Sequence, residues 1–140
     1  MLWLFKEDPE TYSFDLLTNE GKTLWEGVHN NLALIHLRQV REGDKILYYE
    51  TGDKKSVVGI MKASEDARSL DDNAHDIAKS KQVAVEVVPI RRLARPVSLS
   101  EIKASPKFRD FALVKISRLS VLSVSRDQWD EILKMSEDLN

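Results

Sequence analysis

The chain has 140 residues, of which 42% are hydrophobic and 31% are charged, with a formal net charge of −2. This size is typical of a single globular domain, which we expect over residues 1–140, and the absence of cysteine excludes disulfides, thiolate metal ligands and cysteine nucleophiles. The small negative charge argues against a broad nonspecific grip on phosphates, but it leaves open the recognition of nucleic acid through one local pocket.

The first segment, residues 1–6, alternates apolar side chains and is predicted to be a strand that enters the core. No basic segment precedes it and charged residues follow at once, so we do not expect a signal peptide. No apolar run approaches the roughly 20 residues that a membrane-spanning helix needs. We therefore expect a cytoplasmic protein that has no contact with a membrane.

The next segments place polar caps beside a bulky aromatic residue. Ser13 is expected to N-cap a short helix that Gly21 ends. Trp25 then opens a glycine-containing turn, and Asn30 precedes a helix of about three turns. The apolar positions that mark this helix are Leu32, Ile35, Leu37 and Val40. A ring, a flexible turn and an amide at the positive end of a helix suit a small-ligand site, whereas the alternative is a core tryptophan beside an N-cap.

Further strands are predicted in the middle of the chain. Residues 45–51 and 56–63 form a hairpin with a short loop that contains Gly52. Residues 64–80 are polar and are predicted to be a long loop with one helical turn near residues 75–79. Residues 81–93 form a long strand with a bulge or an exposed edge at Pro89.

The last third carries two capping boxes, at Ser98 and Ser125, which each start a helix. Pro106 starts a turn between them, and residues 118–124 are predicted to be a strand. The strands and short helices lack the regular βαβ rhythm of a parallel sheet. We therefore predict an α+β fold, a small mixed or antiparallel β-barrel with short flanking helices.

The sequence lacks a convincing catalytic constellation. His29 and His36 are seven residues apart, which is about 10.5 Å along a helix and too far to share one metal ion. Phosphate-binding glycine loops, G-x-S-x-G elbows and S-x-x-K motifs are all missing from the sequence. We expect no catalytic residue, no metal site and no cofactor, and a binding module rather than an enzyme.

The order of several short motifs resembles the EVE domain, a family of the PUA-like superfamily that is related to modified-base readers such as the YTH domains. The matching motifs are Trp3-Leu-Phe-Lys6, Tyr12-Ser13, Trp25-Glu-Gly27-Val28-His-Asn30, Val57-Val-Gly59-Ile60 and Arg118-Leu-Ser-Val121, with Trp129 in the last helix. The resemblance covers almost the whole chain and implies a PUA-like barrel. It also implies a noncatalytic pocket for a modified nucleobase of DNA or RNA that has been turned out of its stack.

The resemblance further implies roles for individual residues. Trp25 would be the stacking face, Tyr49 (or Tyr48) a second wall, and Asn30 and Ser13 the readers of polar atoms. Backbone groups at Gly27 and Val28 would approach the base closely. The expected contacts to phosphates or base edges are Lys6, His29, Arg38 and Arg118.

Some positions depart from the family pattern. His29 stands where the family usually has arginine, and Glu50-Thr51 replaces a His-Ser pair, which places a carboxylate near the expected mouth. These changes make the site less basic. They keep open two alternatives: a small-molecule sensor or interaction module, and an enzyme acting on a base or nucleotide with Asp72 and His75 in a lid. The oligomeric state is left open.

Overall fold

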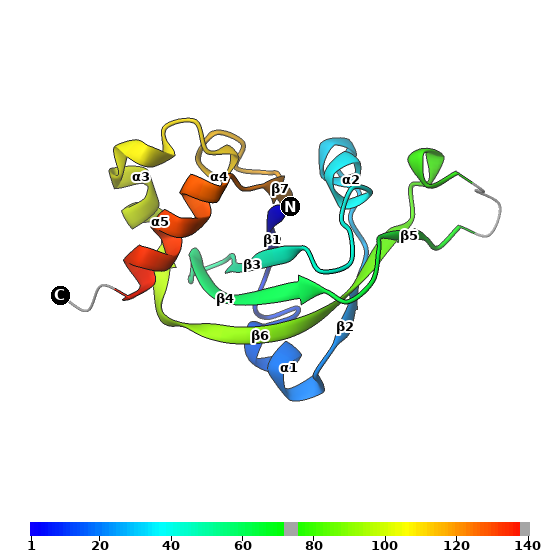
Figure 1. The fold of residues 1–140 in the computed structure, drawn as a ribbon, viewed down its shortest axis with the longest axis horizontal. Coiled ribbons are helices and arrows are strands. Elements are labelled where there is room, and N and C mark those ends of the chain that lie inside the picture. The colour runs from blue at the N-terminus through cyan, green and yellow to red at the C-terminus, as the bar shows by residue number, and fades with distance from the viewer. Residues whose placement is uncertain (72–75, 138–140) are drawn as a thin grey trace.

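One strongly curled sheet organises the computed structural model, which describes residues 1–71 and 76–137 (Figure 1). Its strands are β1 (Leu2–Glu7), β2 (Thr23–Trp25), β3 (Lys45–Glu50), β4 (Ser56–Ala63), β5 (Arg68–Ser69), β6 (Val83–Ser98) and β7 (Val121–Ser123). The main path runs β2-β6-β4-β3-β1-β7, and β5 pairs with β6. Strands β1 and β3 are parallel and the other pairs are antiparallel, so the mixed half-barrel confirms the predicted PUA-like α+β fold.

Short helices flank this sheet on both sides (Figure 1). They are α1 (Phe14–Glu20), α2 (Asn31–Leu37), α3 (Leu99–Ala104), α4 (Ala112–Lys115) and α5 (Arg126–Glu137), with 3-10 turns η1 (Ile77–Lys79) and η2 (Pro106–Phe108). In Figure 1, α1 lies below the sheet, whereas α2 and the group α3 to α5 lie above it. None of the helices in the described ranges has the length and apolar composition that a membrane crossing requires.

Strand β6 joins several parts of the sheet, because it pairs with β2, β4 and β5. It extends to Ser98, five residues beyond the predicted end at residue 93, because its last part pairs with the start of β4. The pairing with β4 shifts register opposite Pro89, which confirms the predicted bulge. The long curved strand brings the loop after β2 next to the segment that precedes β6 (Figure 1).

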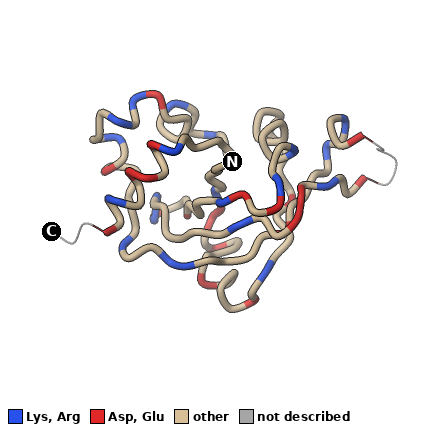
Figure 2. Tube along the Cα trace, viewed as in Figure 1, with Lys and Arg blue, Asp and Glu red and all other residues tan. Residues whose placement is uncertain are grey.

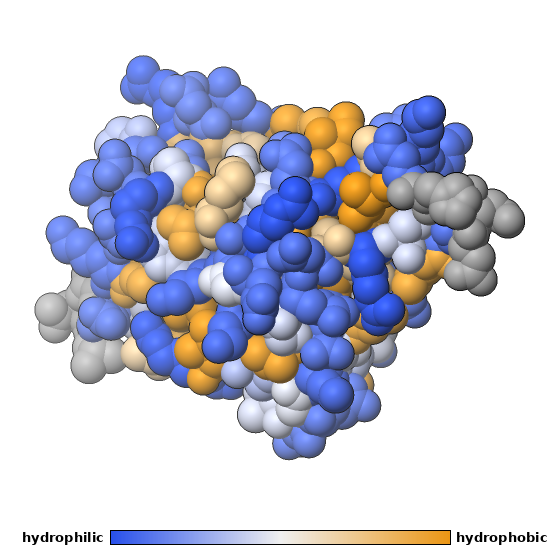
Figure 3. All heavy atoms as spheres, turned by 45° about the vertical axis from the view of Figure 1, so that its right-hand side comes forward, coloured by the Kyte–Doolittle hydropathy of each residue, from blue (hydrophilic) through white to orange (hydrophobic). Residues whose placement is uncertain are grey.

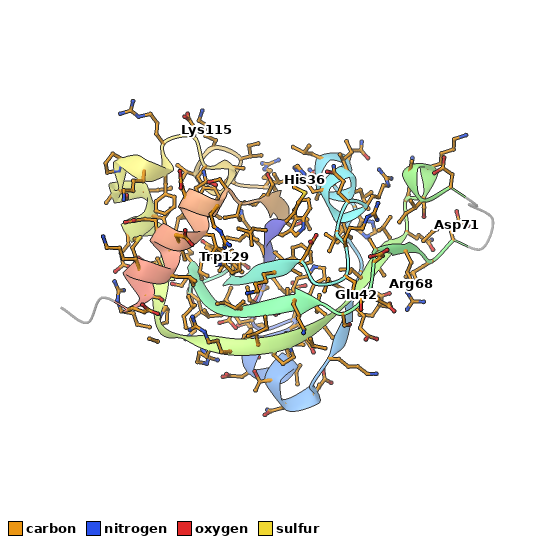
Figure 4. The ribbon with its side chains drawn as sticks, in the orientation of Figure 1. His36, Glu42, Arg68, Asp71, Lys115 and Trp129 are labelled. Atoms are coloured by element: carbon orange, nitrogen blue, oxygen red, sulfur yellow. The ribbon has the colours of Figure 1, made fainter. Side chains whose placement is uncertain are left out.

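Aromatic residues fill the interior of the curl. Trp3 is fully buried and donates from Nε1 to Asp44 Oδ2 at 2.9 Å. Trp129 of α5 is 3% exposed and lies between that helix and the sheet (Figure 4). Both tryptophans are core residues. Lys, Arg, Asp and Glu are spread along the whole trace (Figure 2), in keeping with the small net charge.

Helix α2 differs from its prediction. It has two turns, and it buries Ala33, Leu34 and Leu37. Leu32 and Ile35, two of the apolar positions that marked this helix in the sequence, are 39% and 49% exposed and do not belong to its buried face. The side of the molecule that carries α2 and η1 accordingly shows apolar patches among hydrophilic side chains (Figure 3).

Other elements also differ from the prediction. Neither the short strand β2 nor the single-turn helix α4 was predicted. The strand predicted over residues 118–124 is confined to Val121–Ser123. The polar segment 64–80 is not a plain loop, because Arg68–Ser69 pairs with the start of β6. The helical turn predicted near residues 75–79 is η1, at Ile77–Lys79, whereas Asp72 and His75 lie outside the described residues.

Candidate functional site

Two of the expected polar readers are helix caps. Ser13 Oγ accepts a hydrogen bond from Leu16 N at 3.0 Å, and Asn30 Oδ1 accepts one from Ala33 N at 3.0 Å. Both caps confirm the predicted helix starts. Each of these oxygens satisfies a backbone N–H that the first turn would otherwise leave unpaired.

The Trp25 ring belongs to the aromatic core. It is 6% exposed, and its centroid lies 5.4 Å from that of Phe5 and 5.5 Å from that of Tyr48. The planes of Trp25 and Tyr48 are 88° apart, an edge-to-face pair. Tyr49 points to the other face of β3, as alternation along a strand requires, so the second aromatic wall beside Trp25 is Tyr48 and not Tyr49.

Trp25 also lines a small surface cavity of about 200 Å³, which we call the Trp25 hollow. Its lining is Glu7, Thr11, Tyr12, Thr23, Leu24, Trp25 and Glu26. Burial raises the pKa of the adjacent Tyr48, and the carboxylates of Glu7 and Glu50 add to that rise, so Tyr48 stays protonated. Glu7 and Glu26 make the Trp25 hollow acidic, whereas the neighbouring Tyr48 phenol is neutral.

Glu50 has a structural role rather than a place at the mouth of a site. It is 6% exposed, and its Oε2 accepts a hydrogen bond from Phe14 N at 2.9 Å. This bond ties the first turn of α1 to the end of β3. The prediction that Glu50 places a carboxylate near the mouth was wrong, and the carboxylates that line the Trp25 hollow are those of Glu7 and Glu26.

A second cavity, of about 240 Å³, adjoins the first because Glu26 lines both. We call it the His29 hollow, and its lining is Glu26, Gly27, Val28, His29, Leu70, Lys81, Gln82 and Val83. Val28 and Val83 are buried and form an apolar floor, whereas His29, Lys81 and Gln82 are exposed at its rim. Gly27 has φ of 78°, a conformation that glycine adopts without steric cost.

Leu70, Lys81 and Gln82 were not among the residues singled out from sequence. The register explains their position, because Trp25 pairs with Val85 in the antiparallel β2–β6 ladder. The chain therefore runs from Trp25 toward the segment that precedes Val85, and Val28 and Gln82 both line the His29 hollow. A prediction of strand β2 and of its pairing with β6 would have identified these residues from the sequence.

The predicted Tyr49 and Lys6 come together in a third cavity, of about 270 Å³, which we call the Lys6 pocket. Its lining is Lys6, Tyr49, Thr51, Gly52, Lys55, Leu99, Leu113 and Ser117. Lys6 Nζ lies 5.7 Å from the centroid of the Tyr49 ring and donates to Ser117 O at 3.0 Å. This pocket is on the opposite face of the β1–β3 pair from Phe5 and Tyr48.

The remaining expected phosphate contacts are apart from these cavities. Arg38 donates from its guanidinium to Ser80 O and so anchors the end of η1 to α2. Arg118 is exposed and follows the Lys6 pocket residue Ser117 in the chain. The structure thus divides the predicted site residues among two helix caps, three cavities, one loop anchor and the exposed Arg118.

Comparison with known proteins identifies relatives that match this chain over nearly its whole length. The sequence matches the EVE domain over residues 1–135. It is 25% identical over 165 residues to human thymocyte nuclear protein 1, covering 96% of this chain and 73% of that protein. The NMR structure of Rpa0253 from Rhodopseudomonas palustris is 34% identical, with a TM-score of 0.87 over 99% of this chain and 94% of that one.

A crystal structure of human thymocyte nuclear protein 1 in complex with DNA that contains 5-methylcytosine has the same fold. Its TM-score is 0.87 at 22% identity, and the match covers 99% of both chains.

Proposed function

The chain belongs to the EVE domain family, and on that premise we propose that it is a noncatalytic module that binds a modified nucleobase of DNA or RNA. The observation that carries the proposal is that the family-like segment from Trp25 to His29 lines two adjoining cavities. The complex of human thymocyte nuclear protein 1 with 5-methylcytosine DNA supports this class of ligand.

We place the base in the His29 hollow, because the Trp25 ring is covered on two sides by Phe5 and Tyr48. The exposed imidazole of His29 gives the base an aromatic surface at the rim. A methyl group on the base would contact the apolar floor formed by Val28 and Val83. This contact recovers part of the few kcal/mol that the extrusion of a base costs.

Polar groups around the same hollow suit the edge of a cytosine. The Gln82 side chain makes no hydrogen bond to another described residue, so its amide is available as a paired donor and acceptor. The Glu26 carboxylate accepts hydrogen bonds, as the exocyclic amine of cytosine requires. Lys81 at the rim would contact a neighbouring phosphate.

Fluorescence anisotropy with labelled oligonucleotides tests the proposal. Single-stranded DNA, duplex DNA and RNA, each with one central 5-methylcytosine or one cytosine, are titrated with the full chain. We expect saturable binding that favours the methylated base, and we expect Gln82→Ala to weaken it about tenfold, the effect of losing a hydrogen bond at a base edge.

Gln39→Ala is the matched control, because Gln39 is exposed and its amide donates to Ile35 O in the helix that precedes it. It should leave the affinity unchanged. The proposal fails if none of the oligonucleotides binds, or if the two glutamine variants weaken binding equally.

A further inference from the structure

The Lys6 pocket differs in charge from the two hollows that adjoin Trp25 and His29. Lys6 and Lys55 both line it, and no carboxylate does. Each of the other two cavities is lined by glutamate. Within the described part of the chain, neither Lys6 nor Lys55 forms an ion pair. A chain of net charge −2 therefore concentrates two unpaired cations in one concave site.

Lys6 is held in place by neutral groups. Its Nζ donates to the backbone carbonyl of Ser117 at 3.0 Å and lies 5.7 Å from the centroid of the Tyr49 ring. Burial lowers the pKa of Lys6, because these neutral partners do not replace the water that the ammonium loses. An anion in the pocket would restore the lost stabilisation of the charge.

Lys55 reaches the pocket from an unusual backbone conformation. Its φ is 43°, the left-handed region, which costs a non-glycine residue about 1 kcal/mol or more. The Lys55 carbonyl accepts a hydrogen bond from Leu99 N at 2.8 Å, which fixes the turn between β3 and β4 against the start of α3. Glycine or asparagine would fit this φ at lower cost, yet a lysine occupies the position and lines the cavity.

The rest of the lining combines hydroxyls with apolar surface. Thr51 and Ser117 provide hydroxyl donors, whereas Tyr49, Leu99 and Leu113 provide apolar walls. The volume of about 270 Å³ is near the lower end of the range for small-molecule sites, about 300 Å³. The pocket therefore has room for an anionic group together with part of the organic group that carries it.

From these contacts we propose that the Lys6 pocket binds a phosphate group, held between Lys6 and Lys55, with the hydroxyls of Thr51 and Ser117 as further donors. The phosphate is part of a free nucleotide or belongs to a nucleic acid strand, and the walls of Tyr49 and Leu113 receive the attached sugar. The pocket is on a different face of the β1–β3 pair from the Trp25 ring. This inference does not depend on base binding in the His29 hollow.

NMR titration of the full chain tests the proposal with four probes: inorganic phosphate, adenosine 5′-monophosphate, and a trinucleotide with and without a 5′-phosphate. We expect saturable shifts of the amides of Gly52 and Ser117 with each phosphate-bearing probe. Tighter binding of the monophosphate than of the trinucleotide would identify a free nucleotide as the source. The reverse order would identify a nucleic acid strand.

Two neighbouring lysines provide a matched pair of variants. Lys55→Asn keeps a residue that tolerates positive φ and should weaken phosphate binding at least about tenfold. Lys54→Asn makes the same charge change in the same turn, but Lys54 lines a different surface cavity with Asp8 and Asp53, so it should have no more than a small effect. Lys6→Met should weaken binding as much as Lys55→Asn.

The proposal is overturned if none of the phosphate-bearing probes shifts Gly52 and Ser117. It is equally overturned if Lys54→Asn and Lys55→Asn weaken binding to the same extent, since that result would indicate general electrostatic attraction. Thermal melting of each variant without ligand shows whether a loss of binding comes from unfolding. The Lys55 comparison decides the matter if Lys6→Met does not fold.

Discussion

The Phe14 ring lies directly against Gly59, and a Cβ added to Gly59 would be 2.5 Å from Phe14 Cζ. The ring is 1% exposed and is held by edge-to-face packing on Tyr48, with centroids 5.4 Å apart. Because backbone from β4 and a buried ring meet at this point, neither has room to move. We expect Gly59→Ala to lower the free energy of unfolding by about 1–3 kcal/mol in urea titrations, the usual cost of overpacking.

A second glycine separates steric crowding from backbone strain. Gly21 has φ of 84° and no atom within 4 Å of an added Cβ, so Gly21→Ala should cost about 1 kcal/mol through its backbone alone. Phe14→Leu should relieve part of the Gly59→Ala penalty in a double-mutant cycle and should not change the Gly21→Ala penalty. Equal effects of Phe14→Leu on both would contradict the packing explanation.

Local signals in the sequence predict much of this fold. Side-chain oxygens cap the next turn of the same helix, so Ser13, Asn30 and Ser98 indicate helix starts from neighbouring residues alone. The hairpin of β3 and β4 is also local, because a short loop joins its strands. These elements depend on contacts between residues that are close in the chain.

The site is less predictable because long-range pairing creates it. Trp25 pairs with Val85, 60 residues later, and this pairing brings the residues after Trp25 to the segment before β6, where Val28 and Gln82 line one hollow. Three residues of β2 carry too little pattern to reveal that partner. The family resemblance implied that Trp25 is a stacking face, but the ring is covered by Phe5 and Tyr48, which come from other strands.

Asp44 should make the stability of the fold depend on acid. Burial alone would raise the pKa of Asp44, but hydrogen bonds from the amino terminus, Trp3 Nε1 and Arg41 N outweigh it and hold the pKa below 3.8. A lowered folded-state pKa contributes stability that is present above the unfolded-state pKa and is lost as pH falls through the folded-state value. Asp44→Asn should therefore cost about 1–3 kcal/mol near neutral pH and flatten the decline of stability below about pH 4.

Urea titrations over a series of pH values measure both effects for Asp44. Asp53→Asn is a suitable control because Asp53 is an exposed carboxylate in the turn after β3. It should change neither the stability at neutral pH nor the acid response. An unchanged acid response in Asp44→Asn would show that other groups govern unfolding in acid.

Asn30 should contribute to stability as the cap of α2. Asn30→Ala removes the acceptor for Ala33 N and should lower the free energy of unfolding by about 1 kcal/mol. Asn30→Asp keeps an acceptor at the positive end of the helix and should retain most of that stability. Urea titrations of both variants test the cap. Oligonucleotide binding by Asn30→Asp then tests whether the amide nitrogen also contacts a base.

Glu26 should determine which pyrimidine the His29 hollow accepts, if a base binds there as proposed. Thymine and 5-methylcytosine carry the same methyl group, but they present a carbonyl and an amine, respectively, at the neighbouring position. A carboxylate accepts a hydrogen bond from the amine and repels the carbonyl, so the chain should prefer 5-methylcytosine to thymine in otherwise identical oligonucleotides. Glu26→Gln offers both a donor and an acceptor and should reduce this preference about tenfold or more.

Competition anisotropy with the two oligonucleotides measures the preference of each variant directly. Glu7→Gln is the control, since Glu7 lines the Trp25 hollow and not the His29 hollow. Because both glutamates carry the same charge, a general gain in phosphate affinity from removing a carboxylate would appear in both variants and for both oligonucleotides. A change in the ratio of the two affinities that is confined to Glu26→Gln would therefore place the base edge at Glu26. An unchanged ratio in Glu26→Gln would exclude that contact.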